Sequence, residues 1–125
     1  MGLLSGLLGN STAASATDAA EELADFLIPE EEVVAAYKLI RDQIVFTNCR
    51  IIWIDKQGFS GSKKEISSIP YRSIDRFSVE NAGALDLDAE LKIWIKGGAA
   101  PILWRFAKGA PVQEAHKVIA HYVLS

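Results

Sequence analysis

The stretch FTNCRIIWIDKQGFSG, from Phe46 to Gly61, decides the fold of this chain. Its four residues Thr47 to Arg50 predict a turn, because Asn48 tolerates left-handed backbone geometry. Arg50 to Asp55 follows as a β-branched and aromatic run that is typical of a strand. Lys56-Gln57-Gly58 predicts the next turn, because glycine adopts positive φ at little cost. One strand between two tight turns indicates an antiparallel meander.

Upstream of this stretch the spacing of apolar residues changes along the chain from the period of a helix to the period of two that is typical of a strand. Asp18-Ala19-Ala20-Glu21 has the spacing of a capping box, and Pro29 ends the helical pattern, so we expect a helix from Asp18 to about Ile28. Its apolar positions are Ala19, Leu23, Phe26 and Leu27. Glu32 to Ile40 then suits a strand, and Arg41-Asp42 a tight reversal into a second strand with Ile44 and Phe46 on one face.

Downstream, four further strands and a helix are expected. The strands are Lys64 to Ile69, Ile74 to Glu80, Leu87 to Ile95 and Ile102 to Phe106. Pro111 is placed to open a helix, where its missing N–H costs nothing, with Val112, Ala115, Ile119 and Tyr122 as the apolar face. Seven short strands followed by one helix predict a mainly β barrel or sandwich of antiparallel sheets, closed by the terminal helix.

The overall composition excludes one class of partner. The chain has 125 residues, enough for one domain with its own core, and half of them are apolar. The formal net charge is −3, and the thirteen Lys and Arg residues are scattered, with only Lys63 and Lys64 adjacent. Nucleic acids are bound through a concentrated basic surface. No nucleic acid is therefore expected as a partner.

The residues that carry catalysis in other proteins form no known motif here. Cys49 is the only cysteine, so it has no intrachain disulfide partner, which fits a reducing, cytoplasmic location. No histidine lies within sixty residues of it, and His116 and His121 are spaced too far around a helix to converge on one metal. We therefore expect no enzyme, no cofactor and no metal.

Asp86, Asp88 and Glu90 alternate along the predicted strand, so their carboxylates project from one face. They could bind calcium or do acid–base chemistry, but the position at which an EF-hand loop requires glycine is Leu91. The same face continues as Lys92 and Trp94. A solvated or protein-contacting face is the interpretation that we favour over a metal site.

Trp94 points to a contact, because tryptophan is enriched at interface anchors and is unusual on a bare charged surface. Other predicted strands also carry apolar residues on both faces, such as Ile51 beside Ile52 and Leu103 beside Trp104. A small barrel has one interior and cannot bury both faces of its strands. We therefore expect the N-terminal helix, the C-terminal helix and a second subunit to cover the remaining apolar side chains. Scattered surface hydrophobes are the alternative.

The opening MGLLSGLLGN has too short an apolar run, and no preceding cation, for a secretory signal. We interpret it as a small amphipathic element. No segment of the sequence approaches the length of apolar residues that would span a bilayer.

Three blocks together give a family resemblance: RDQIVFTNCRIIWIDKQGFSG, then IPYRSIDRFSVE, then AGALDLDAELKIW. They resemble the bacterial pleckstrin-homology (PH) domains, long catalogued as a family of unknown function, and the opening MGLLSGLLGN does too. The resemblance implies a PH-like barrel of two near-orthogonal antiparallel sheets of seven strands with a C-terminal helix. We expect one globular domain overall, with an N-terminal helical extension, 1–29, and a PH-like domain, 30–125.

The resemblance also implies ring-shaped cyclic homo-oligomers in which polar strand surfaces of adjacent protomers meet, and a role in protein–protein interaction. The residues expected at this interaction face are Arg76, Glu80, Asp86, Asp88, Glu90, Lys92 and Trp94. Eukaryotic relatives often bind phosphoinositides through cations between strands one and two. Here that loop is the short Arg41-Asp42, so lipid binding is not carried over. A weak phospholipid-headgroup binder using Lys56, Lys63 and Lys64 is the alternative function.

Overall fold

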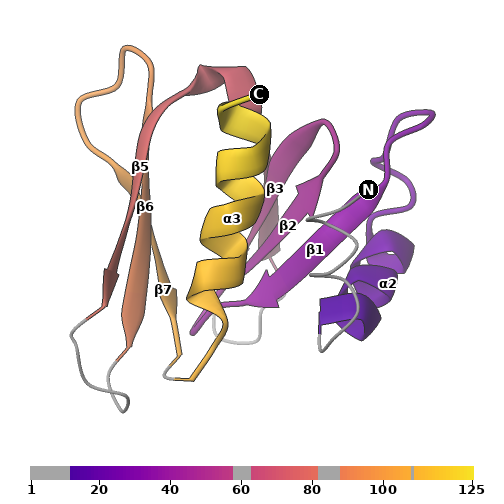
Figure 1. The fold of residues 1–125 in the computed structure, drawn as a ribbon. Coiled ribbons are helices and arrows are strands. Elements are labelled where there is room, and N and C mark those ends of the chain that lie inside the picture. The colour runs from indigo at the N-terminus through magenta and orange to yellow at the C-terminus, as the bar shows by residue number, and fades with distance from the viewer. Residues whose placement is uncertain (1–11, 58–62, 82–87, 108) are drawn as a thin grey trace. The chain divides into compact units, whose positions relative to one another are not determined.

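A computed structural model describes residues 12–57, 63–81, 88–107 and 109–125 of the chain (Figure 1). The described helices are α2 (Thr12–Glu22), the 3-10 turn η1 (Tyr71–Ser73) and α3 (Val112–Val123). The described strands are β1 (Val33–Lys38), β2 (Gln43–Thr47), β3 (Arg50–Gln57), β4 (Lys63–Pro70), β5 (Ile74–Asn81), β6 (Ala89–Ile95) and β7 (Ile102–Phe106). The chain divides into two compact units, Met1–Ile69 and Pro70–Ser125, which are described in turn.

The first unit holds a four-stranded sheet in the order β1-β2-β3-β4, which is the predicted meander (Figure 1). β1 pairs antiparallel with β2, and β2 with β3, so that Val45 lies opposite both Ala36 and Ile52. A register irregularity falls between Val33 and Ala35. The turns predicted at Arg41-Asp42 and at Asn48-Cys49 are confirmed by the ends of the strands that they join.

Helix α2 lies beside β1 (Figure 1) and covers one face of this sheet. Ala19 and Leu23 pack in one buried cluster with residues of β1, β2 and β3: Ala36, Val45, Ile52 and Ile54. Ile44 and Phe46, on the other face of β2, are fully buried as well. The expectation that the N-terminal helix covers part of the surplus apolar surface is therefore confirmed.

The predicted boundaries of this helix are wrong. It begins at Thr12 and ends at Glu22, so Asp18 lies inside it and caps nothing. The Ala-rich stretch before Asp18 has high intrinsic helix propensity, which outweighs the local capping pattern. Leu23 and Leu27 still face the buried cluster, but Phe26 is 51% exposed, because the chain leaves the helix before it.

The second unit holds a three-stranded antiparallel sheet in the order β5-β6-β7, with α3 packed against β5, β6 and η1. Val112, Ala115 and Ile119 on α3 are buried, as predicted. Phe77 of β5 meets the ring of His116 at 5.2 Å between centroids, which places α3 on the Phe77 side of the sheet. Pro111, predicted as the first residue of this helix, is instead the N-cap residue, and α3 begins at Val112.

No helix in the described part of the chain combines the length and the apolar character needed to cross a bilayer. The amphipathic element expected in MGLLSGLLGN lies outside the described residues.

Candidate interaction surface

The alternation predicted for β6 is confirmed from Ala89 to Trp94. Leu91 and Ile93 are fully buried, and the alternate residues Glu90, Lys92 and Trp94 are only half-buried. Strand residues alternate between faces, so these three side chains point away from α3. Asp88 is exposed just before the strand begins, whereas Asp86 lies outside the described residues.

Pairing between strands extends this face across all three strands of the sheet. On β5, Arg76 lies opposite Trp94, Ser78 opposite Lys92, and Glu80 opposite Glu90. On β7, Leu103 lies opposite Lys92 and Arg105 opposite Glu90. We call this surface the β5–β7 outer face; its residues are Arg76, Ser78, Glu80, Glu90, Lys92, Trp94, Leu103 and Arg105.

The charges on the β5–β7 outer face are arranged in pairs. Lys92 Nζ lies 3.3 Å from Glu80 Oε1, and Arg105 Nη2 lies 3.0 Å from Glu90 Oε2. Glu80 and Glu90 lie directly opposite each other, and like charges in that position repel. The repulsion is offset because each carboxylate has its own cation nearby. Exposed pairs of this kind contribute only about 0–1 kcal/mol each to folding. These charge pairs therefore add little to the stability of the fold, and their main effect is on the charge pattern of the surface.

Trp94 differs from the expectation of an exposed anchor. It is half-buried, because the Arg76 guanidinium lies over its ring, 4.1 Å from the centroid. A cation over an aromatic face is an attractive contact of about 0.5–1 kcal/mol at an accessible site. The pair forms one amphipathic unit, with an apolar ring and a charge carried on top of it.

The sequence reasoning missed Arg105. Its signal was present, since Ile102-Leu103-Trp104-Arg105-Phe106 alternates, with Trp104 and Phe106 buried and Leu103 and Arg105 exposed. What the alternation could not supply was the register, which sets Arg105 against Glu90 rather than against another residue of β6.

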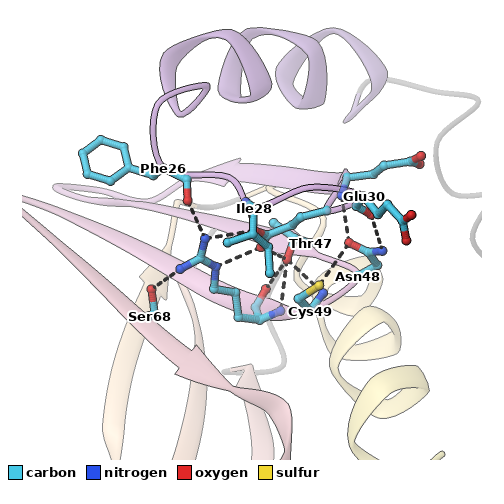
Figure 2. A network of polar contacts seen from close by, with 10 residues as sticks. Phe26, Ile28, Glu30, Thr47, Asn48, Cys49 and Ser68 are labelled. Atoms are coloured by element: carbon cyan, nitrogen blue, oxygen red, sulfur yellow. Dashed lines mark hydrogen bonds and ion pairs between the residues drawn. The ribbon is translucent and has the colours of Figure 1, made fainter.

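A second polar cluster lies in the first unit, around Arg50, and Figure 2 shows its partners Phe26 and Ser68. Arg50 Nε donates to Glu31 Oε2 at 2.8 Å and Nη2 donates to Glu31 Oε1 at 2.9 Å, a two-point ion pair. Nη2 also donates to the carbonyl of Phe26 at 2.8 Å, and Nη1 to Ser68 Oγ at 2.8 Å. The hydroxyl of Thr47 donates to Glu31 Oε2 at 2.7 Å. These bonds tie the segment between α2 and β1 to the β2–β3 turn and to β4.

Glu31 is an ionised carboxylate inside the fold, with a side chain that is 0% exposed. The Arg50 hydrogen bonds, helped by Thr47 and the Ile28 N–H, lower its pKa to about 2 against the opposing effect of burial. Glu31 in turn raises the pKa of Arg50. Every group in this cluster has its partners within the protein, so we read it as a structural clamp and not as a reactive centre.

Cys49 and the acidic residues belong to no metal-holding group in the described part of the chain. Cys49 is an exposed free thiol in the β2–β3 turn, and its neighbour Arg50 is engaged with Glu31. No group of three or more His, Cys, Asp or Glu side chains is placed to hold a metal ion in ranges 12–57, 63–81, 88–107 and 109–125. The Asp86 carboxylate of the predicted ladder lies outside these ranges.

Comparison with known proteins gives matches along nearly the whole chain. The family model of the bacterial PH domain matches residues 2–123. The uncharacterised protein YjqA of Bacillus subtilis (strain 168) is 52% identical over 121 residues, which cover 96% of this chain and 97% of YjqA. The uncharacterised protein YozO of the same organism is 32% identical and is covered completely, with 94% of this chain.

Solved structures show the same fold. The pleckstrin-homology domain from Shewanella amazonensis SB2B has 44% identity and a TM-score of 0.82, covering 99% of this chain and 100% of that one. A DUF1696 family protein with a pleckstrin-homology domain, from Shewanella loihica PV-4, has 44% identity and a TM-score of 0.77, with 86% and 92% coverage. The family and the PH-like fold expected from the three sequence blocks are both confirmed.

Proposed function

Because the chain belongs to the bacterial PH domain family, we propose that it is a non-enzymatic PH-like domain that assembles into a cyclic homo-oligomer and mediates protein–protein interaction. The observation that carries this proposal is the β5–β7 outer face. It combines paired charges of both signs with a large ring and the exposed Leu103 on one regular sheet surface.

Such a face is suited to recognising protein. Mixed charges set the register of a contact and reject wrong partners, while aromatic and Arg side chains supply most of the binding free energy. A single-sign face would repel its own copy, but this one offers both signs. A ring needs a contact that is repeated head to tail until it closes.

The test is the mass of the purified protein by light scattering across a dilution series. We expect a discrete multiple of the 13.6 kDa chain. We expect Arg105→Glu, and separately Trp94→Ala, to shift the population toward monomer. Lys117→Glu, a charge reversal at an exposed position of α3, is the matched control and should leave the mass unchanged. A monomer at every concentration would overturn the assembly.

Interaction with a different protein is tested with the same variants. Proteins captured from the native cytoplasm by the wild-type chain should be absent when Arg105→Glu is the bait and present with Lys117→Glu. Binding to anionic vesicles that is lost at physiological salt would instead favour the lipid-headgroup alternative. Lys64 is one of the cations expected for that alternative, and its Nζ lies 3.3 Å from Glu22 Oε2.

A further inference from the structure

The turn between α2 and β1 has an unusual backbone. A hydrogen bond from the Glu31 N–H to the Ile28 carbonyl, at 3.0 Å, closes it around Pro29 and Glu30. Glu30 has φ of 69°, in the left-handed region that a turn of this kind normally gives to glycine or asparagine. A glutamate persists there only where the surroundings fix the conformation.

The surroundings do fix it, through two side chains. Asn48 Nδ2 donates to the Glu30 carbonyl at 3.2 Å, and Asn48 Oδ1 accepts from the Glu32 N–H at 2.8 Å. The buried Glu31 accepts from the Ile28 N–H at 3.1 Å. The backbone from Phe26 to Glu32 is therefore held from several sides, and its outward side chains are presented in a set arrangement.

Two of these outward side chains are large and apolar. Phe26 is 51% exposed and Ile28 is 56% exposed. Figure 2 shows the Phe26 ring pointing away from the hydrogen-bonded atoms, while the Phe26 carbonyl is bound by Arg50. Apolar anchors on a preorganised backbone lose little conformational entropy when a partner covers them.

The segment that carries these anchors is acidic. The first 37 residues contain seven of the sixteen carboxylates and no Lys or Arg, so all thirteen cations lie in the rest of the chain. Glu31 is neutralised by Arg50, but Asp25, Glu30 and Glu32 are exposed near the anchors. A partner for this turn should offer apolar surface bordered by cations.

The β5–β7 outer face has that composition. Trp94 and Leu103 supply apolar surface, and the cations Arg76, Lys92 and Arg105 outnumber the carboxylates Glu80 and Glu90, with which Lys92 and Arg105 pair, so the face carries one net positive charge. We infer that the Phe26–Glu32 turn of one copy docks on the β5–β7 outer face of a second copy. This rests on the proposed assembly and deepens it, because a ring requires two different complementary surfaces and the turn is the second one.

The first experiment removes the anchors. We expect the double variant Phe26→Ser, Ile28→Ser to weaken association by roughly 30-fold or more, as loss of an interface hot spot does. Its thermal midpoint should match that of the wild type when both are compared at a dilution that keeps them monomeric, because both side chains are exposed in the single chain. Ile40→Ser, at another exposed apolar position in the β1–β2 turn, is the matched control and should assemble normally. A double variant that assembles like wild type would overturn the inference while leaving the proposed function intact.

The second experiment mixes two assembly-deficient copies. One carries Arg105→Glu and keeps the turn, and the other carries Phe26→Ser with Ile28→Ser and keeps the face. Mixed together they should form a one-to-one complex of about twice 13.6 kDa, since one intact turn meets one intact face and nothing further can add. Two monomers in the mixture would overturn the turn-to-face contact. A wild-type chain that is monomeric throughout would instead overturn the proposed assembly itself.

Discussion

Glu31 ties the N-terminal segment to the sheet of the first unit. It lies in the linker between α2 and β1, yet its carboxylate is buried against Arg50 and Thr47 from a different part of the chain. A buried pair of this kind adds less to stability than its contacts suggest, but removing one partner leaves the other charge without compensation. The clamp therefore specifies where the linker lies.

We predict that Glu31→Gln costs roughly 3 kcal/mol of unfolding free energy at neutral pH. The pKa of Glu31 falls from 4.5 to about 2 on folding, so its contribution is complete above about pH 4.5 and is lost as the pH falls through about 2. Urea unfolding of the wild type and of Glu31→Gln, between neutral and acid pH, should show the difference in their unfolding free energies closing over that window. Glu65→Gln, at an exposed position of β4, should open no gap. A constant gap at all pH values would contradict the assigned pKa.

Cys49 contributes to the fold through its backbone. Its N–H donates to Thr47 Oγ1 at 3.0 Å, and its thiol is exposed. We predict that Cys49→Ser changes the unfolding free energy by less than about 0.5 kcal/mol and leaves the assembled mass unchanged. Loss of assembly in this variant, measured by light scattering, would show that the thiol takes part in a contact.

At the scale of elements, β6 separates the core from the surface within a single strand. Leu91 is fully buried, whereas its neighbour Lys92 is half-buried on the outer face and pairs with Glu80 at 3.3 Å. Such a strand packs on the α3 side through one set of side chains and leaves the alternate set on the outer face. Substitutions can therefore change the core and the outer face separately.

We predict that Leu91→Ala lowers the unfolding free energy by roughly 2–5 kcal/mol, as truncation of a buried leucine does. Lys92→Ala should change it by about 0–1 kcal/mol in the monomer, the contribution of an exposed ion pair. Denaturant melts under conditions that favour the monomer would compare the two. Similar costs for both variants would show that the two faces had been assigned wrongly.

At the scale of the whole molecule, charge is distributed unevenly along the chain, and the proposed contact joins its acidic beginning to its more basic remainder. Attraction between exposed charges is screened over about 10 Å at 0.1 M salt. Assembly by such a contact should respond to ionic strength, unlike assembly through an apolar patch alone.

We predict that the concentration for half-assembly rises at least severalfold between about 0.05 M and about 0.5 M salt. Sedimentation velocity at matched protein concentrations would measure it. Sodium chloride should be used, since sulfate also strengthens apolar burial and would mask the effect. Assembly that becomes stronger with sodium chloride would indicate a mainly apolar contact and contradict the role of the charged turn.

The sequence by itself determined the local architecture, because local architecture depends on near neighbours. Alternation placed Leu91 and Ile93 inside and Glu90 and Lys92 outside, and turn residues located the β1–β2 and β2–β3 reversals. The three family blocks were specific enough to identify the PH-like fold. The N-terminal ends of both helices were placed wrongly, at Asp18 and at Pro111.

The tertiary structure alone decided which distant residues meet. No spacing in the sequence pairs Glu31 with Arg50, places Arg105 beside Glu90, or sets Arg76 over Trp94. Strand register and chain reversal bring these residues together, and both are fixed by burial of the whole apolar set rather than by any local pattern. The same reason explains Phe26, whose helical spacing predicts a core position but whose carbonyl is held by Arg50 with the ring left outside.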